Sequence, residues 1–143
     1  MKTSFKQKPI FLAALVMALC LLLLSGCGSS TVPEGFDLKT VEDTAQSLTN
    51  MIHASDYQGL LQNATAAIKA QVTPDLLRDG WQSYFAQIGA FTKIASVKTQ
   101  AVEENGVSYA RTVVISRHEK GTSTFTFVFD AEMKLAGIFG NFQ

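Results

Sequence analysis

The segment Thr122-Ser123-Thr124-Phe125-Thr126-Phe127-Val128-Phe129 decides the fold, because two kinds of side chain alternate along it. Phenylalanine occupies positions 125, 127 and 129, whereas threonine or valine occupies the positions between them. Successive side chains of a β-strand point to opposite faces of its sheet, so this alternation predicts a strand with one strongly apolar face. We expect helices to cover the phenylalanine face.

The same two-residue period continues on both sides of this strand. Asn105-Gly106 is typical of a type I′ hairpin turn, and Glu119-Lys120-Gly121 supplies the next turn. After the third strand, residues 130–134 turn the chain again. The pattern therefore predicts an antiparallel meander of four strands, over residues 96–104, 107–115, 124–129 and 135–142.

Three helices are predicted before the meander, because apolar residues recur there at helical spacing. Asp37 caps the first helix, which ends near Ala54, and Ser55 to Gln58 has the form of a capping box that starts the second. Thr73-Pro74 starts the third helix, and Gly89 ends it. Helices followed by an antiparallel sheet indicate a single domain of the α+β class.

The N-terminus has the pattern of an export signal. Met1 to Pro9 is short and basic, and Ile10 to Leu24 is an apolar run of fifteen residues. A helix that spans a bilayer needs roughly 17–25 residues, so this run is short for a permanent anchor and fits a signal peptide. An uncleaved anchor helix that ends at Gly26 is the alternative.

The four residues Leu24-Ser25-Gly26-Cys27 resemble the bacterial lipobox. In that motif the cysteine receives a diacylglycerol thioether, and cleavage before it leaves the lipidated cysteine at the N-terminus. We therefore predict a lipoprotein signal peptide over 1–26, a lipidated Cys27 with a flexible tether over 27–35, and one domain over 36–143. This places the domain at the cell membrane, lipid-anchored on its extracytoplasmic face.

Charge and cysteine content exclude several functions for the part after residue 26. Nine basic residues stand against twelve acidic ones there, a net charge of −3, which does not favour nucleic-acid binding. The two cysteines are Cys20, in the apolar run, and Cys27, which the lipid would occupy. No disulfide or cysteine nucleophile is therefore expected in the domain.

Several short elements occur in a fixed order along most of the mature chain: Asp56-Tyr57, Val72 to Leu77, Trp81, Gly89-Ala90-Phe91, and Phe129 to Ile138. Together they resemble a bacterial family of unknown function, domain-of-unknown-function family 3887. The resemblance implies a nuclear transport factor 2-like fold, in which a curved sheet wraps helices into a cone that often holds a pocket. That superfold hosts isomerases, dehydratases, binding modules and dimerisation domains, so it does not imply one function.

No catalytic, cofactor or metal site is expected from the sequence. His53 at a helix end and His118 in a turn lie on different predicted elements without metal-ligand spacing, which favours structural or solvent-exposed roles for both. The acidic residues gather at caps and turns, where a carboxyl group lacks the burial that would tune its pKa for acid–base work.

The candidate pocket residues are those that suit the interior of a cone: aromatic side chains with polar tips, and an arginine on a strand with apolar neighbours. They are Tyr57, Trp81, Tyr84, Arg111, Phe125 and Phe127. Their alternative role is simple core packing or, for Arg111, a place on the exposed face or in a dimer contact.

The function favoured by these patterns is a non-catalytic, membrane-anchored binding module. Its partner would be a small apolar ligand, a peptide or another envelope protein, and the domain would be able to form a homodimer through its sheet. A small isomerase-like or hydratase-like enzyme that uses the cone pocket is the first alternative. A structural dimerisation scaffold is the second.

Overall fold

The computed structural model describes residues 29–143, so the predicted signal peptide (1–26) and the lipidation site Cys27 lie outside the described residues. The helices are α2 (Leu38–His53), α3 (Tyr57–Gln62), α4 (Ala66–Gln71) and α5 (Pro74–Ile88). The strands are β1 (Phe91–Glu104), β2 (Val107–His118), β3 (Thr122–Phe129) and β4 (Leu135–Phe142).

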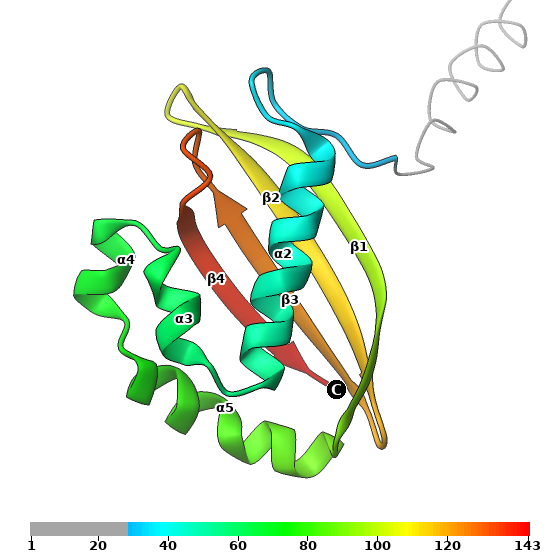
Figure 1. Ribbon diagram of the computed structural model, residues 1–143. Coiled ribbons are helices and arrows are strands. Elements are labelled where there is room, and N and C mark those ends of the chain that lie inside the picture. The colour runs from blue at the N-terminus through cyan, green and yellow to red at the C-terminus, as the bar shows by residue number, and fades with distance from the viewer. Residues whose placement is uncertain (1–28) are drawn as a thin grey trace, which may run out of the picture.

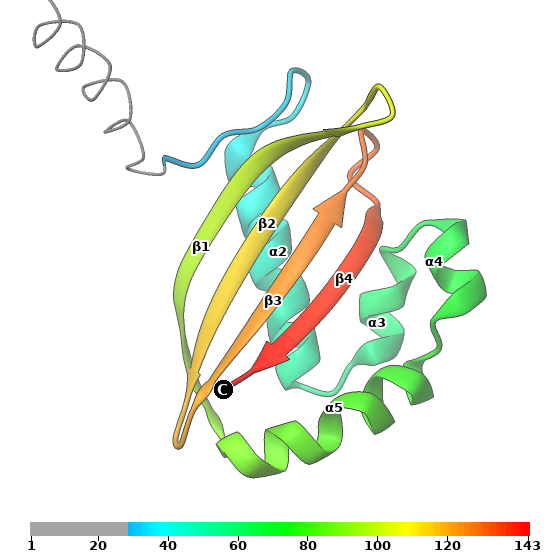
Figure 2. The same cartoon turned by 180° about the vertical axis from the view of Figure 1, so that it is seen from behind.

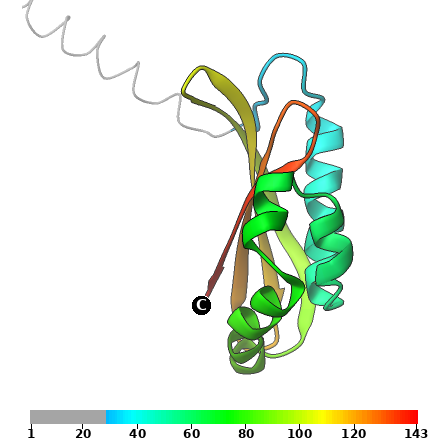
Figure 3. The ribbon, with the colours of Figure 1, turned by 90° about the vertical axis from the view of Figure 1, so that its left-hand side faces the viewer.

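The four strands form one antiparallel sheet in the order β1-β2-β3-β4, which confirms the predicted meander and the α+β class. The sheet is bowed but not closed, because β1 and β4 remain its two edges (Figure 1). All the described helices lie on one side of it, as the edge-on view shows (Figure 3). The other face carries no helix (Figure 2).

The phenylalanine face of β3 forms the centre of the core. Phe125, Phe127 and Phe129 are each 0% exposed, as the alternation of the sequence predicted. α2 crosses this side of the sheet and contacts β1, β2 and β3 (Figure 1). Its buried face includes Leu48 and Ile52, which belong to the same hydrophobic cluster as the phenylalanines.

The predicted helix starts rest on capping side chains, with one correction. Asp37 and Thr73 each accept a hydrogen bond from the backbone N–H three residues later, as expected for N-caps. α3 is capped by Asp56, whose Oδ1 accepts from the N–H of Gly59 at 2.8 Å. The capping box expected from Ser55 is therefore displaced by one residue, and Ser55 itself has a φ of 59°.

The chain contains four described helices where three were predicted, because the second predicted helix is broken. At the break, Leu135 at the start of β4 donates its N–H to the oxygen of Asn63 at 2.8 Å and accepts from the N–H of Thr65 at 3.0 Å. Those bonds use backbone groups that a continuous helix would need for itself. Thr65 then caps α4 by accepting from the N–H of Ile68. Helical periodicity could not reveal a break that depends on a strand so distant in sequence.

None of the helices within residues 29–143 combines the length and the apolar character needed to cross a membrane.

The hairpin between β1 and β2 has the predicted geometry. Asn105 and Gly106 have φ values of 52° and 77°, the positive pair that a type I′ turn requires. β1 starts at Phe91 rather than at residue 96, as its first part contains two register shifts against β2. Those irregularities hide its period from the sequence.

The buried phenylalanine face predicts a sharp contrast between two substitutions. Phe127→Ala should lower the free energy of unfolding by about 3–5 kcal/mol, because it removes a fully buried ring and leaves a cavity. Phe139→Ala, on a ring that is 64% exposed, should change it by less than about 0.5 kcal/mol. Urea unfolding of the domain from residue 28 onward measures both, and equal effects would contradict the packing described here.

Candidate functional site

The two histidines meet at one end of the sheet. His53 is the last residue of α2, and His118 is the last residue of β2. Their ring centroids are 5.1 Å apart with the planes inclined by 68°. His118 is 8% exposed and ends β2, so the expectation that it sits in a solvent-exposed turn is wrong, whereas a structural role for it remains compatible with its burial.

The ring of His118 is held in one orientation by two hydrogen bonds. Its Nδ1 lies 3.0 Å from the main-chain oxygen of Gly89, and its Nε2 lies 3.0 Å from Oγ of Ser123. A carbonyl oxygen only accepts, so Nδ1 must carry the proton. In the neutral ring Nε2 then accepts from the Ser123 hydroxyl. The ring is therefore fixed in its Nδ1–H tautomer whenever it is neutral.

His53 is packed between aromatic rings. It stacks on Phe91 with ring centroids 4.1 Å apart and an angle of 17° between the planes, and it meets the ring of Phe85 edge-on at 5.7 Å. Its Nε2 lies 3.3 Å from Oγ of Ser116. The pKa of His53 is lowered to about 4, mainly by burial and to a smaller extent by electrostatic repulsion from the neighbouring His118 ring. His53 is therefore neutral at physiological pH, not the cation that a helix C-terminus would favour.

A cavity of about 180 Å³ opens beside these rings, and we call it the histidine pocket. Its walls come from the ends of α2 and α5 and from the start of β1, and its lining residues are Ile52, His53, Ser55, Phe85, Gly89, Ala90, Phe91 and His118. The walls combine apolar and aromatic surface with two imidazole rings. Such a combination suits a small ligand that is held by ring contacts and oriented by a hydrogen bond.

The turn after β2 braces the corner of the pocket between α5 and β1. Lys120 donates its N–H to the oxygen of Ile88 at 2.9 Å, and Glu119 donates its N–H to the oxygen of Ala90 at 3.0 Å. Oε2 of Glu119 also accepts a hydrogen bond from the N–H of Ala90 at 3.2 Å. Gly89 has a φ of +80°, and a Cβ there would lie 3.0 Å from that oxygen. The corner therefore requires glycine at position 89.

Four of the six predicted pocket residues gather in one aromatic cluster next to the histidine pocket. Trp81 lies 6.1 Å from Tyr57 and 5.2 Å from Phe125, centroid to centroid, and Phe125 in turn lies 6.0 Å from His53. Tyr84 stacks on Phe142 at 5.0 Å. Tyr57 and Phe125 are buried, so they act mainly as core.

Trp81 and Tyr84 also border a hollow of about 370 Å³ with Phe142 and the polar edge of β4. Gly140 makes room for the indole ring, because a Cβ there would lie 3.2 Å from both Trp81 Nε1 and the Phe125 ring. This hollow is open to solvent, and Tyr84 is 48% exposed.

The other two predicted residues lie elsewhere. Phe127 is 0% exposed and continues the core away from the histidines, 6.3 Å from Phe125. Arg111 is exposed on the helix-free face of the sheet, where it lines a separate hollow of about 380 Å³ with Tyr109 and Phe139. The structure therefore does not bring Arg111 together with the aromatic cluster.

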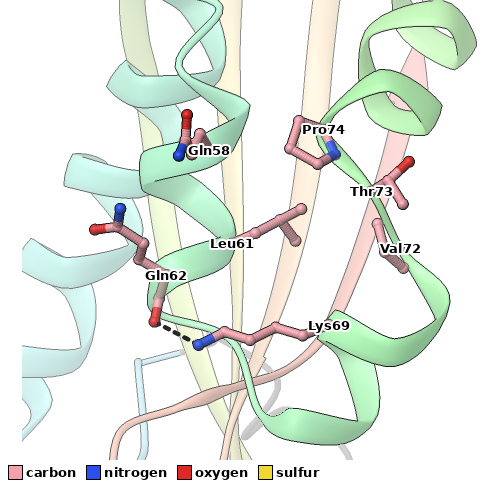
Figure 4. Close-up of a pocket in the computed structure, with 7 residues that line it drawn as sticks. All are labelled: Gln58, Leu61, Gln62, Lys69, Val72, Thr73 and Pro74. Atoms are coloured by element: carbon pink, nitrogen blue, oxygen red, sulfur yellow. Dashed lines mark hydrogen bonds between the residues drawn. The ribbon is translucent and has the colours of Figure 1, made fainter.

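A further groove of about 370 Å³ lies between α3 and the segment that joins α4 to α5 (Figure 4). Leu61, Val72 and Pro74 give it an apolar floor, and glutamine, threonine and lysine side chains surround that floor. Lys69 Nζ donates to the main-chain oxygen of Gln62 at 3.1 Å and so closes one end (Figure 4). This groove lacks the imidazole groups and the depressed histidine pKa that distinguish the histidine pocket.

The histidine pocket was missed by sequence reasoning, although one signal for it was present. Ala110, Thr112, Val114 and Ser116 alternate inward along β2 and are buried, and the same parity reaches His118. Extending the strand to His118 would have placed its ring in the core. The meeting with His53 depends on where α2 ends over the sheet, which the sequence does not indicate.

Within residues 29–143, no three His, Asp or Glu side chains gather in a group that could hold a metal ion.

The comparisons with known proteins indicate a family and a fold. The model of a family described as "Protein of unknown function (DUF3887)" matches residues 45–138. A solved structure described as the NMR structure of a protein from Ruminococcus gnavus ATCC 29149 is similar, with a TM-score of 0.67 and 19% sequence identity. The match covers 77% of this chain and 96% of that chain. No curated protein matches.

The depressed pKa of His53 predicts how stability depends on pH. An unfolded chain takes up a proton on His53 near pH 6.5, whereas the folded chain does so only near pH 4. Stability should therefore fall as the pH is lowered from about 6.5 to 4, and His53→Gln should remove that part of the loss. Urea unfolding at several pH values measures it. An imidazole NMR titration that places the pKa of His53 near 6.5 would contradict the account.

Proposed function

We propose that this chain, which belongs to the DUF3887 family, is a membrane-anchored extracytoplasmic module that binds a small, uncharged, ring-shaped molecule in the histidine pocket. The family description assigns no activity, so the proposal rests on the site itself. The observation that carries it is the neutral imidazole of His53, held between Phe91 and Phe85 at the wall of a cavity of about 180 Å³.

The pocket favours an uncharged ligand because the same burial that lowers the pKa of His53 would penalise a ligand charge. Its volume suits one ring or two fused rings, and aromatic walls favour stacked or edge-on contacts with them. The hydrogen bond between Nε2 of His53 and Ser116 occupies one imidazole nitrogen. Within residues 29–143 no hydrogen bond engages Nδ1, so this nitrogen is the group that would orient the ligand.

The positions of the acidic residues support binding over catalysis. All twelve carboxylate side chains of the chain lie within the described residues, and each is exposed or half-buried. Glu119 is the acid that contacts the pocket rim, where it accepts from a backbone N–H. An isomerase-like or hydratase-like enzyme would need an acid or base with a tuned pKa facing the ligand. His53, with a pKa of about 4, is a weak base at neutral pH.

The membrane anchor is part of the proposal and rests on the sequence. A basic start, an apolar run of fifteen residues and Leu24-Ser25-Gly26-Cys27 stand in the order of a lipoprotein signal. Cys27 would carry the lipid. The domain would then lie on the extracytoplasmic side of the membrane. It has no cysteine after residue 27, so the oxidising environment there could not form a disulfide within it.

We further propose that the fold is a small member of the nuclear transport factor 2-like superfold. A bowed antiparallel sheet with helices against one face supports this assignment (Figures 1 and 3). The histidine pocket would then occupy one end of the space between the helices and the sheet.

A dimerisation scaffold is the second candidate, because the helix-free face of the sheet exposes apolar side chains. Phe139 is 64% exposed, and Ile115 is 36% exposed on the same face. Exposed apolar patches of this kind often mark protein contacts. This role and the pocket use opposite faces of the sheet, so one chain could serve both.

The ligand proposal predicts a response to a simple aromatic probe. Indole should shift the NMR signals of the His53 imidazole protons, and the shift should saturate as the indole concentration rises. Phe91→Ala should weaken indole binding about 2- to 13-fold, because it removes an aromatic wall of the pocket whose contact with a ligand ring is worth about 0.5–1.5 kcal/mol. Phe139→Ala, on the opposite face, is the matched control and should leave binding unchanged. Indole shifts confined to residues around Arg111 would refute the assignment.

The anchor proposal predicts that the two cysteines behave differently. Cys27→Ala should abolish the incorporation of radiolabelled palmitate, because the thioether would have no sulfur to form on. Cys20→Ala, in the apolar run, should retain the label. Labelling and membrane fractionation of bacteria that express each variant measure this. Unchanged label and unchanged membrane retention in Cys27→Ala would exclude lipidation at this cysteine.

A further inference from the structure

The chain just before α2 lies along the edge of the sheet. Thr31 donates its N–H to the oxygen of Thr99 at 2.9 Å, and Thr31 Oγ1 accepts from the N–H of Ala101 at 3.3 Å. Oγ of Ser30 accepts from the N–H of Thr99 at 3.2 Å. Residues 30–32, which we call the strap, are thus hydrogen-bonded along the outer edge of β1. Val32 packs against the core. Part of the segment that the sequence predicted as a flexible tether is docked on the domain.

The strap covers backbone groups that an edge strand leaves without partners. β1 is an outer strand, so the N–H and carbonyl of Thr99 and the N–H of Ala101 point away from β2. Three hydrogen bonds to the strap satisfy them. The attachment therefore fixes the point on the domain at which the chain leaves toward Cys27.

The distance that remains to the proposed lipid is short. Three residue steps separate Cys27 from Ser30, and a fully extended chain advances at most about 3.6 Å per residue, so the gap is at most roughly 11 Å. A longer flexible tether would let the domain turn freely. From this short reach we infer that the exposed edge of β1 is the side of the domain that rests against the lipid headgroups. This inference depends on the lipid anchor at Cys27 proposed above.

The chemistry of that edge suits headgroups rather than the hydrocarbon interior. Lys93, Lys98 and Gln100 are exposed polar residues on β1, and Glu103 and Glu104 are exposed at its hairpin end. The two lysines can approach anionic lipid phosphates, whereas the glutamates would lie toward water. β4 forms the opposite edge of the sheet. Strands in a sheet are about 4.8 Å apart, so β4 lies roughly 14 Å farther from the lipid than β1 does.

Two fluorescent labels on the lipidated mature protein, cleaved before Cys27, test the inference. Gln100→Cys places the label on β1 and Asn141→Cys places it on β4; both positions are exposed. The mature chain has no other thiol to label if Cys27 carries its thioether. Each labelled protein is reconstituted in vesicles of phosphatidylethanolamine and phosphatidylglycerol that contain a headgroup-attached quencher. We expect strong quenching at position 100 and loss of most of that quenching at position 141.

Two proline variants distinguish the loss of the strap's hydrogen bonds from the effect of placing a proline anywhere in this segment. Thr31→Pro removes the N–H that bonds to Thr99 and the hydroxyl that accepts from Ala101, so quenching at position 100 should fall toward that at position 141. Ser29→Pro is the matched control, because Ser29 makes no hydrogen bond to β1 within the described residues. In Ser29→Pro, quenching of the label at position 100 should equal that in the protein without a proline substitution.

The outcomes distinguish the inference from the proposal on which it rests. Failure of the protein to float with vesicles would overturn the lipid anchor and the inference together. Flotation with equal quenching at positions 100 and 141 in the unaltered strap would leave the anchor standing and overturn the membrane-facing edge. This comparison does not require Thr31→Pro to fold.

Discussion

The burial of Phe125, Phe127 and Phe129 under α2 is the constraint on which the rest of the structure depends. Three rings on one face of β3, each 0% exposed, need an apolar helix face directly above them. α2 supplies it through residues spaced by helical turns, whereas β3 supplies its rings at every second position. The apolar face of α2 and the phenylalanine face of β3 pack into one layer, and this packing sets how α2 lies across the sheet.

The position of α2 in turn creates the candidate site. Because the helix ends at His53 above the last residue of β2, two imidazoles meet among Phe85, Phe91 and Phe125. Their aromatic surroundings remove water from His53 and keep it neutral. The pocket is therefore a consequence of core packing at one end of the sheet, and its chemistry is that of a neutral hydrogen-bonding group on an aromatic wall.

The features that the sequence predicted correctly are those encoded locally. Alternation in β3, the caps at Asp37 and Thr73, and the Asn105-Gly106 turn each depend on neighbouring residues. The break before Thr65, the docking of Thr31 on β1 and the meeting of His53 with His118 depend on partners far along the chain. Of the predicted pocket residues, Trp81 and Tyr84 border a hollow, but Arg111 lies on the other face because β2 alternates.

Native mass spectrometry of residues 28–143, purified gently and compared with His53→Trp, tests the central claim most directly. We expect a small adduct on the wild-type protein and none on His53→Trp, because the larger tryptophan ring would fill the histidine pocket. The mass of the adduct would identify the ligand. A wild-type protein without any adduct, or an adduct retained equally by His53→Trp, would contradict the claim that this pocket is the binding site.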